Sequence, residues 1–122
     1  MAVIVPKVVT VGYGNSAVQT VSWTPVTNAD TCRAVQYPEF SDKSIQVAGT
    51  FGSASVALNG SNDGTNFAAL RDPSSTTIAI TSAGIKAVLE NTFQVQPSIS
   101  GGDGTQSLTI TILFHAANPL RA

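Results

Sequence analysis

The stretch Asp42–Leu70 decides the fold and reads DKSIQVAGTFGSASVALNGSNDGTNFAAL. Apolar and polar residues alternate in two runs separated by Gly52 and Ser53, and the apolar side carries Ile45, Val47, Phe51, Ala54, Val56 and Leu58. A period of two is the pattern of a β-strand that buries one face. The following run Gly60–Gly64 tolerates positive φ and is expected to close a hairpin. This segment is scaffold and contains no reactive group.

The rest of the chain extends the same pattern. We expect strands at about Val3–Val11, Val18–Thr24, Thr31–Tyr37, Ser44–Phe51, Ala54–Asn59, Asn66–Leu70, Thr76–Ile80, Phe93–Ile99 and Ser107–Phe114. Pro97 cannot donate a hydrogen bond to a sheet, so its strand is expected at an edge or with a bulge. Short strands separated by turn signals predict an all-β, antiparallel β-sandwich. A jelly roll fits the strand count, and an immunoglobulin-like sandwich is the nearest alternative.

One segment departs from the β pattern. Within Thr81–Glu90, the apolar residues Ile85, Val88 and Leu89 stand at helical spacing, and the first residues can cap a helix. The sequence therefore predicts one short helix near residues 82–90, which bridges two strands.

Length and composition narrow the class of protein. A chain of 122 residues predicts a single domain over residues 1–122. Only 11% of residues are charged, the net charge is −1, and the basic residues are scattered. Neither nucleic-acid binding nor a polybasic membrane patch is therefore expected. No stretch approaches the length of a membrane-spanning helix, and Pro6 and Lys7 interrupt the apolar start too early for a signal peptide.

The uncharged start, Ala2–Val5, has two interpretations. It is either an ordinary strand of its own sheet or an extended arm at residues 1–6 that adds to the sheet edge of a neighbouring subunit. The ordinary strand is favoured, and the arm stays open as the alternative.

Reactive residues are few and dispersed. The single histidine, His115, is expected at a rim, and the single cysteine, Cys32, as a small buried apolar residue that forms no disulfide, which favours an intracellular folding site. One cysteine and one histidine cannot build a zinc site, and Asn62–Gly64 lacks the ligand pattern of an EF-hand. Gly101–Gly104 is expected to be a hairpin turn rather than a phosphate cradle. We expect no enzyme, no catalytic residue, no cofactor and no metal.

The aromatic residues also have two interpretations. They line a sugar-binding face or fill the core, and the candidates are Trp23, Tyr37, Phe40, Phe51 and Phe67. Core filling is favoured for Trp23, Phe51 and Phe67, because such rings dominate packing. The turn Tyr37–Phe40 is a candidate exposed contact point.

Several motifs resemble those of small head proteins of tailed bacteriophages, the decoration or cement proteins. The matching segments are Asp42–Gly52, Leu58–Phe67, Thr81–Ile85, which resembles the short helix of the family, and Gly101–Thr105. The similarity runs from about Trp23 to Phe114. Gln96-Pro97 stands where relatives have Arg-Pro, so any contact made by that arginine is not carried over.

The resemblance implies a jelly-roll-like β-sandwich without an active site. It implies a structural virion protein that is assembled in the host cytoplasm and binds the outer surface of the capsid. There it would cement neighbouring subunits of the major capsid protein, as a homo-oligomer (dimer or trimer).

We expect the contact residues on the amino-terminal arm and on two turns, because loops and termini carry binding on rigid sandwiches. They are Val3, Ile4, Val5, Tyr37, Glu39, Phe40, Asn62, Asp63 and Asn66. The alternative function is a carbohydrate- or receptor-binding β-sandwich module of a phage tail or adhesin. A Ser-Asn-Asp-Gly turn followed by an aromatic residue also occurs in discoidin-like carbohydrate-binding sandwiches. A hydrolase is the third interpretation, which the scarcity of reactive residues disfavours.

Overall fold

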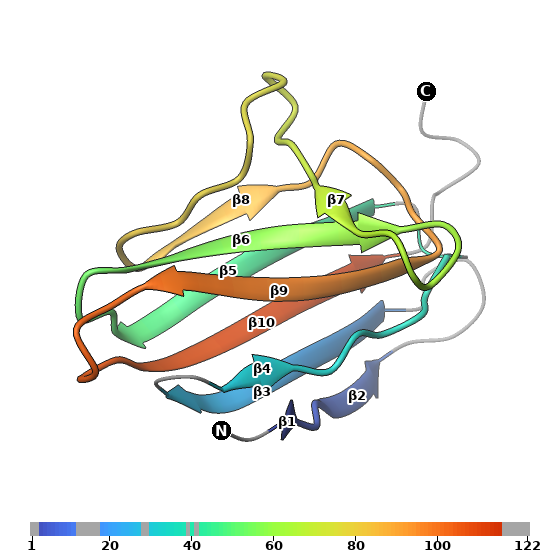
Figure 1. Cartoon of the computed structure of the whole chain (residues 1–122). Coiled ribbons are helices and arrows are strands. Elements are labelled where there is room, and N and C mark those ends of the chain that lie inside the picture. Colours follow the sequence, from blue (N-terminus) through green and yellow to red (C-terminus); the bar gives the residue numbers. More distant parts are fainter. Residues whose placement is uncertain (1–2, 12–17, 28–29, 39, 41, 116–122) are drawn as a thin grey trace.

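A computed structural model describes residues 3–11, 18–27, 30–38, 40 and 42–115. In this part of the chain all the regular elements are β-strands and none is a helix (Figure 1), which confirms the all-β class. The strands are β1 (Val3–Ile4), β2 (Lys7–Val11), β3 (Val18–Thr27), β4 (Thr31–Cys32), β5 (Asp42–Thr50), β6 (Ala54–Ser61), β7 (Ala68–Ala69), β8 (Gly84–Ala87), β9 (Gln94–Gly101) and β10 (Ser107–His115).

The strands form two antiparallel sheets and one small parallel pair. The five-stranded sheet has the order β2-β3-β10-β5-β8, the three-stranded sheet has the order β7-β6-β9, and β1 pairs with β4. The two larger sheets lie one in front of the other in Figure 1. The space between them holds the core, whose largest fully buried side chains are Trp23, Phe114, Ile45, Leu58, Ile78, Leu108, Ile110 and Ile112.

The predicted alternation is confirmed in the long strands. In β10, Leu108, Ile110, Ile112 and Phe114 are buried, while the residues between them face outward. Pro97 lies in β9, an edge strand of the three-stranded sheet, as its missing N–H group predicted. The hairpin at Gly60–Gly64 is also confirmed, because β6 and β7 pair through Gly60 and Ala68.

At one end of the molecule lie two crossings between the sheets, one from β5 to β6 and one from β9 to β10. β5 pairs with β10 in the five-stranded sheet, whereas their continuations β6 and β9 pair with each other in the three-stranded sheet. The two crossings touch, because the Asp103 amide donates to the Gly52 carbonyl at 2.7 Å. The expected hairpin at Gly101–Thr105 is therefore wrong. Its glycines make a tight bend, but the next strand belongs to the opposite sheet.

The predicted helix near residues 82–90 is also wrong. Gly84–Ala87 forms β8, which pairs antiparallel with Ser44–Val47 of β5. Of the three apolar residues that suggested the helix, only Val88 is buried, whereas Ile85 and Leu89 are exposed. As a strand, Gly84–Ala87 instead forms hydrogen bonds with backbone groups of β5 that would otherwise have no partner strand on this side.

Two shorter predictions are only partly met. Thr76–Ile80 forms isolated bridges at Thr77 and Ile80 rather than a strand. At the amino terminus, β1 pairs with β4 of the same chain, and the Arg33 amide donates to the Ile4 carbonyl at 3.0 Å. Addition of residues 1–6 to a neighbouring subunit stays a prediction.

We predict that Gly49→Ala destabilises the protein more than Gly104→Ala. Gly49 has a φ of +112°, and a Cβ there would overlap the carbonyl oxygen of Ser107, where β5 pairs with β10. Gly104 has a φ of +91° but open space around it. Backbone strain alone costs about 1–3 kcal/mol, and overlap adds to it at Gly49 only. Denaturant unfolding measures both free energies, and equal losses would contradict the close approach.

Candidate functional site

Three loops meet at the end of the molecule opposite the contact between Gly52 and Asp103 (Figure 1). The Asn91 side chain donates to the Pro38 carbonyl at 3.1 Å, and the Phe93 amide donates to Asn62 Oδ1 at 3.0 Å. Gln94 Nε2 donates to Gln36 Oε1 at 2.8 Å. These bonds join the loop before β5, the β6–β7 loop and the segment before β9. We call the resulting surface the loop end; it consists of Gln36, Pro38, Asn62, Asn91, Phe93 and Gln94.

The β6–β7 loop holds its shape through Asp63. One oxygen of this carboxylate, Oδ1, accepts hydrogen bonds from the amides of Asn66 (2.8 Å) and Thr65 (2.9 Å) and from Ser61 Oγ (2.9 Å). The other, Oδ2, accepts one from the Asn66 side chain at 2.8 Å. These bonds, the Asn66 amide first, hold the pKa of Asp63 well below its usual range. The carboxylate is thus fully used inside the loop, where it fixes the position of the neighbouring Asn62.

We predict that Asp63→Asn destabilises the protein at neutral pH, and that this difference shrinks in acid. Because folding lowers the pKa of Asp63, its contribution is present above the ordinary carboxyl pKa of about 4 and is lost as the pH falls below it. Thermal unfolding of both proteins between pH 7 and pH 2.5 measures the difference. A difference independent of pH would show that the negative charge does not stabilise the loop.

The turn at Tyr37–Phe40 packs inward. Phe40 is buried, and the ring of the half-buried Tyr37 lies 6.0 Å from that of Phe40 and 5.1 Å from that of Phe114, measured between ring centroids. The two rings therefore support the loop end from below and are not an exposed contact point. Glu39 lies outside the described residues.

Phe93 is the exposed ring of the loop end, and the sequence reasoning missed it. From its alternation with Val95 and Pro97, the sequence predicts that Phe93 lies on the buried face of the strand. However, β9 begins only at Gln94, and Phe93 remains 42% exposed. The turn-forming residues Asn91 and Thr92 directly before it are the signal that could have indicated an early end of the strand pattern.

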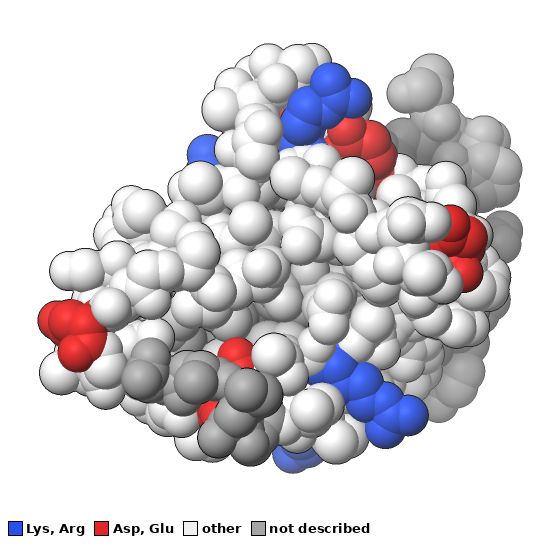
Figure 2. All heavy atoms as spheres, viewed as in Figure 1, with Lys and Arg blue, Asp and Glu red and all other residues white. Residues whose placement is uncertain are grey.

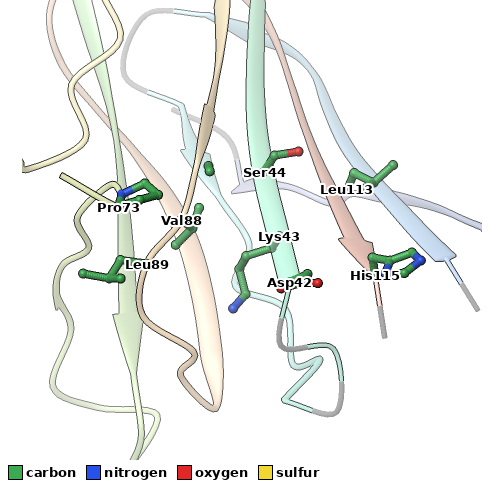
Figure 3. Close-up of a pocket in the computed structure, with 9 residues that line it drawn as sticks. Asp42, Lys43, Ser44, Pro73, Val88, Leu89, Leu113 and His115 are labelled. Atoms are coloured by element: carbon green, nitrogen blue, oxygen red, sulfur yellow. The ribbon is translucent and has the colours of Figure 1, made fainter. Parts of the chain in front are cut away.

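A hollow of about 460 Å³ lies beside the loop end (Figure 3) and is lined by Asp42, Lys43, Ser44, Pro73, Ala87, Val88, Leu89, Leu113 and His115. Lys43 is only 5% exposed, and its Nζ donates to Asn91 Oδ1 at 2.9 Å and to the Glu90 carbonyl at 3.3 Å. Lys43 thus links the floor of the hollow to the loop end. A smaller hollow of about 220 Å³ shares Ser44 and Leu113 and continues over the outer face of β5 and β10.

Asp42, Lys43 and His115 are the titratable side chains that line the larger hollow. Asp42 and His115 are cross-strand neighbours at the rim of the larger hollow. Burial lowers the pKa of Lys43, against the opposing charge of Glu90. Burial, with the charge of Asp30, raises the pKa of the Cys32 thiol to about 12, so this cysteine is not a ready nucleophile. In the described residues, no three side chains of histidine, cysteine, aspartate or glutamate gather as a metal site would require.

We predict that raising the pH from 7 to 10 stabilises the wild type relative to Lys43→Met. Folding lowers the pKa of Lys43, so the unfolded chain binds more protons in this window and the folded state gains stability as they are lost. The methionine variant lacks this term. Urea unfolding at several pH values measures the gap, and a gap that moves the other way would mean that the hydrogen bonds outweigh burial.

The predicted contact residues fall in separate regions. Asn62, Asp63 and Asn66 are exposed at or beside the loop end. The arm lies away from it, where β1 pairs with β4; Val3 and Val5 are exposed there, and Ile4 packs against the core. Contact of these residues with a capsid stays a prediction.

Most of the other aromatic residues pack in or against the hydrophobic core. Trp23 is fully buried and its indole N–H donates to the Arg33 carbonyl at 3.0 Å, so it fills the core as expected. Phe51 packs against the core, and Phe67 is half-buried. Figure 2 shows few charged side chains on the face it presents; a basic and an acidic one touch at the top, and the others are scattered among uncharged ones.

Comparisons with known proteins leave the family open. No family model matches the chain, and no curated protein matches it. Among solved structures, protein NMB1881 from Neisseria meningitidis aligns with a TM-score of 0.38 and 9% identity over 91% of this chain and 82% of its own. The capsular polysaccharide assembling protein CapF from Staphylococcus aureus gives 0.34 and 8% over 94% and 30%. Likeness at this level carries no argument about function. In the part of the chain that the structure describes, no helix is long and apolar enough to cross a membrane.

Proposed function

We propose that this protein is a structural virion protein that binds the outer surface of a tailed-phage capsid. It cements neighbouring subunits of the major capsid protein and stabilises the head, without enzymatic activity. The observation that carries the proposal is the loop end. There, an exposed Phe93 ring is framed by carboxamide side chains that hydrogen bonds already hold in place.

Such a surface suits a wide protein partner. Aromatic residues are enriched at the centre of protein interfaces, whereas most charged residues are depleted there. Because Asn62, Asn91 and Gln94 are fixed before binding, less conformational entropy is lost when a partner covers them. The motifs that resemble the decoration proteins, Asp42–Gly52 and Leu58–Phe67, include the β6–β7 loop that adjoins this surface.

The topology supports the finer classification as a jelly-roll-like sandwich. In a jelly roll, an antiparallel ribbon folds over so that its two halves lie in opposite sheets. The pairs β5–β10 and β6–β9, with their two adjacent crossings, have this arrangement.

Cementing follows from mass action on a repeated lattice. A protein that binds only the assembled shell stabilises that shell, and many copies on a symmetric surface multiply a modest contact. A homo-oligomer, dimer or trimer, at symmetric positions of the capsid belongs to this proposal. Neither nucleic acid nor a membrane is a partner in it.

We predict that Phe93→Ala weakens binding to expanded heads that lack this protein by more than tenfold. Truncation of a central aromatic residue at an interface costs about 2 kcal/mol or more. The control is Ile85→Ala, which removes a still more exposed apolar side chain (64% against 42% for Phe93) from β8, outside the loop end. Co-sedimentation measures affinity and the ratio to the shell protein. Absence of saturable wild-type binding would overturn the capsid proposal, and equal affinities of the two variants would overturn the role of the loop end.

A carbohydrate- or receptor-binding module is the second candidate. A ring beside side-chain amides, as at Phe93 and Asn62, is also a plausible surface for a sugar. Binding of the wild type to host cells or glycan beads, lost in Phe93→Ala, together with no binding to heads, would establish this function instead.

A further inference from the structure

We propose that the chain forms a two-fold dimer through its β2 edge. In this dimer, β2 pairs antiparallel with β2 of a second copy, and the two five-stranded sheets become one continuous sheet. The inference does not rest on capsid binding, because it concerns the protein free in solution.

The edge of β2 is open and almost uncharged. β2 pairs with β3 on one side, and no strand of the described part of the chain pairs with its other side. Its sequence, KVVTV, carries one charge, at Lys7. An edge of this kind offers free backbone donors and acceptors to any second strand, and proteins usually guard it with charges, proline or a covering segment.

The edge also exposes apolar side chains on both faces. Val8 and Val9 point to opposite faces, yet each is 43% exposed. Val8 lies opposite Val21, which is fully buried, so the core layer ends between β3 and β2. Val3 and Val5, directly before the strand, are exposed as well. These four valines are half of the large apolar residues exposed in the described chain.

The other edge of the same sheet is guarded. β8 has only four residues, and Lys86 there pairs with Asp72 at 3.7 Å, between Nζ and Oδ2. Just beyond β8, the Leu89 amide donates to the Arg71 carbonyl at 2.8 Å, and Arg71 Nε pairs with Glu90 at 2.6 Å. Charges and existing backbone bonds thus oppose strand addition at β8. Along β2, by contrast, Lys7 is the single charge, and β3 is the single strand of the described chain that pairs with it.

Self-pairing of β2 fits its sequence. Centred on Val9, an antiparallel pair places Val9 opposite Val9 of the second copy, and Val8 opposite Thr10. Each Lys7 then lies opposite Val11, so the two lysines are at opposite ends of the pair and their like charges do not meet. Pairing of two identical edges is isologous and uses up both edges, so the assembly closes as a dimer rather than growing into a fibre.

The oligomeric state of the full chain tests this inference. Sedimentation velocity over two decades of concentration should show a monomer–dimer equilibrium for the wild type. Val9→Lys should be monomeric throughout, because two lysines would face each other at the axis, and its unfolding should stay close to that of the wild type since Val9 is on the surface. The matched control Ile85→Lys places the same charge on the exposed face of the other edge and should dimerise normally.

Cysteine cross-linking tests the register. Val9→Cys should form a disulfide-linked dimer under mild oxidation, because residues facing each other at the axis lie within reach of a disulfide. Ile85→Cys should not form such a dimer. The native Cys32 is buried and should not be cross-linked. A wild type that is monomeric at all concentrations, or a Val9→Lys variant that dimerises like the wild type, would overturn the proposal. Loss of the dimer only in Ile85→Lys would move the interface to β8.

Discussion

The contact between the two crossings is the constraint on which the rest of the structure depends. Gly52 and Asp103 meet there through one backbone hydrogen bond, and Gly49 approaches the Ser107 carbonyl as closely as only a glycine can. Because β5 pairs with β10 and β6 with β9, four long strands act as one antiparallel ribbon bent over the core. The bend sets how the sheets face each other, and the buried aliphatic chains and Trp23 fill the space between them.

The loop end, at the other end of the molecule, has a different construction. Its loops are held by hydrogen bonds of side-chain amides rather than by strand pairing, and the half-buried ring of Tyr37 and the buried ring of Phe40 support them. Side-chain hydrogen bonds of this kind leave apolar and amide groups exposed in fixed positions. A partner can then be recognised without first ordering the loops, which is why a rigid sandwich is an effective platform for binding loops.

Unequal sheet widths explain where apolar side chains stay exposed. The five-stranded sheet extends past the three-stranded one, so a residue such as Val8 points to the inner face without a layer beneath it. At the other edge, the segment from Arg71 to Glu90 brings charges and backbone bonds to β8. One sheet thus has one guarded edge and one apolar edge, a difference that composition alone does not reveal.

By itself, the sequence determined the long strands β3, β5, β6, β9 and β10, their buried faces and the core role of Trp23, because period-two alternation and turn residues act locally. The tertiary structure decided which strands became neighbours. The glycines at Gly101–Thr105 suit a hairpin or a crossing equally, and pairing of β10 with β3 and β5 made them a crossing. The helical spacing near residues 82–90 was overridden by the unpaired edge of β5, and Phe93 became exposed because β9 starts one residue later. Such outcomes depend on contacts between distant segments, whose energies no local pattern contains.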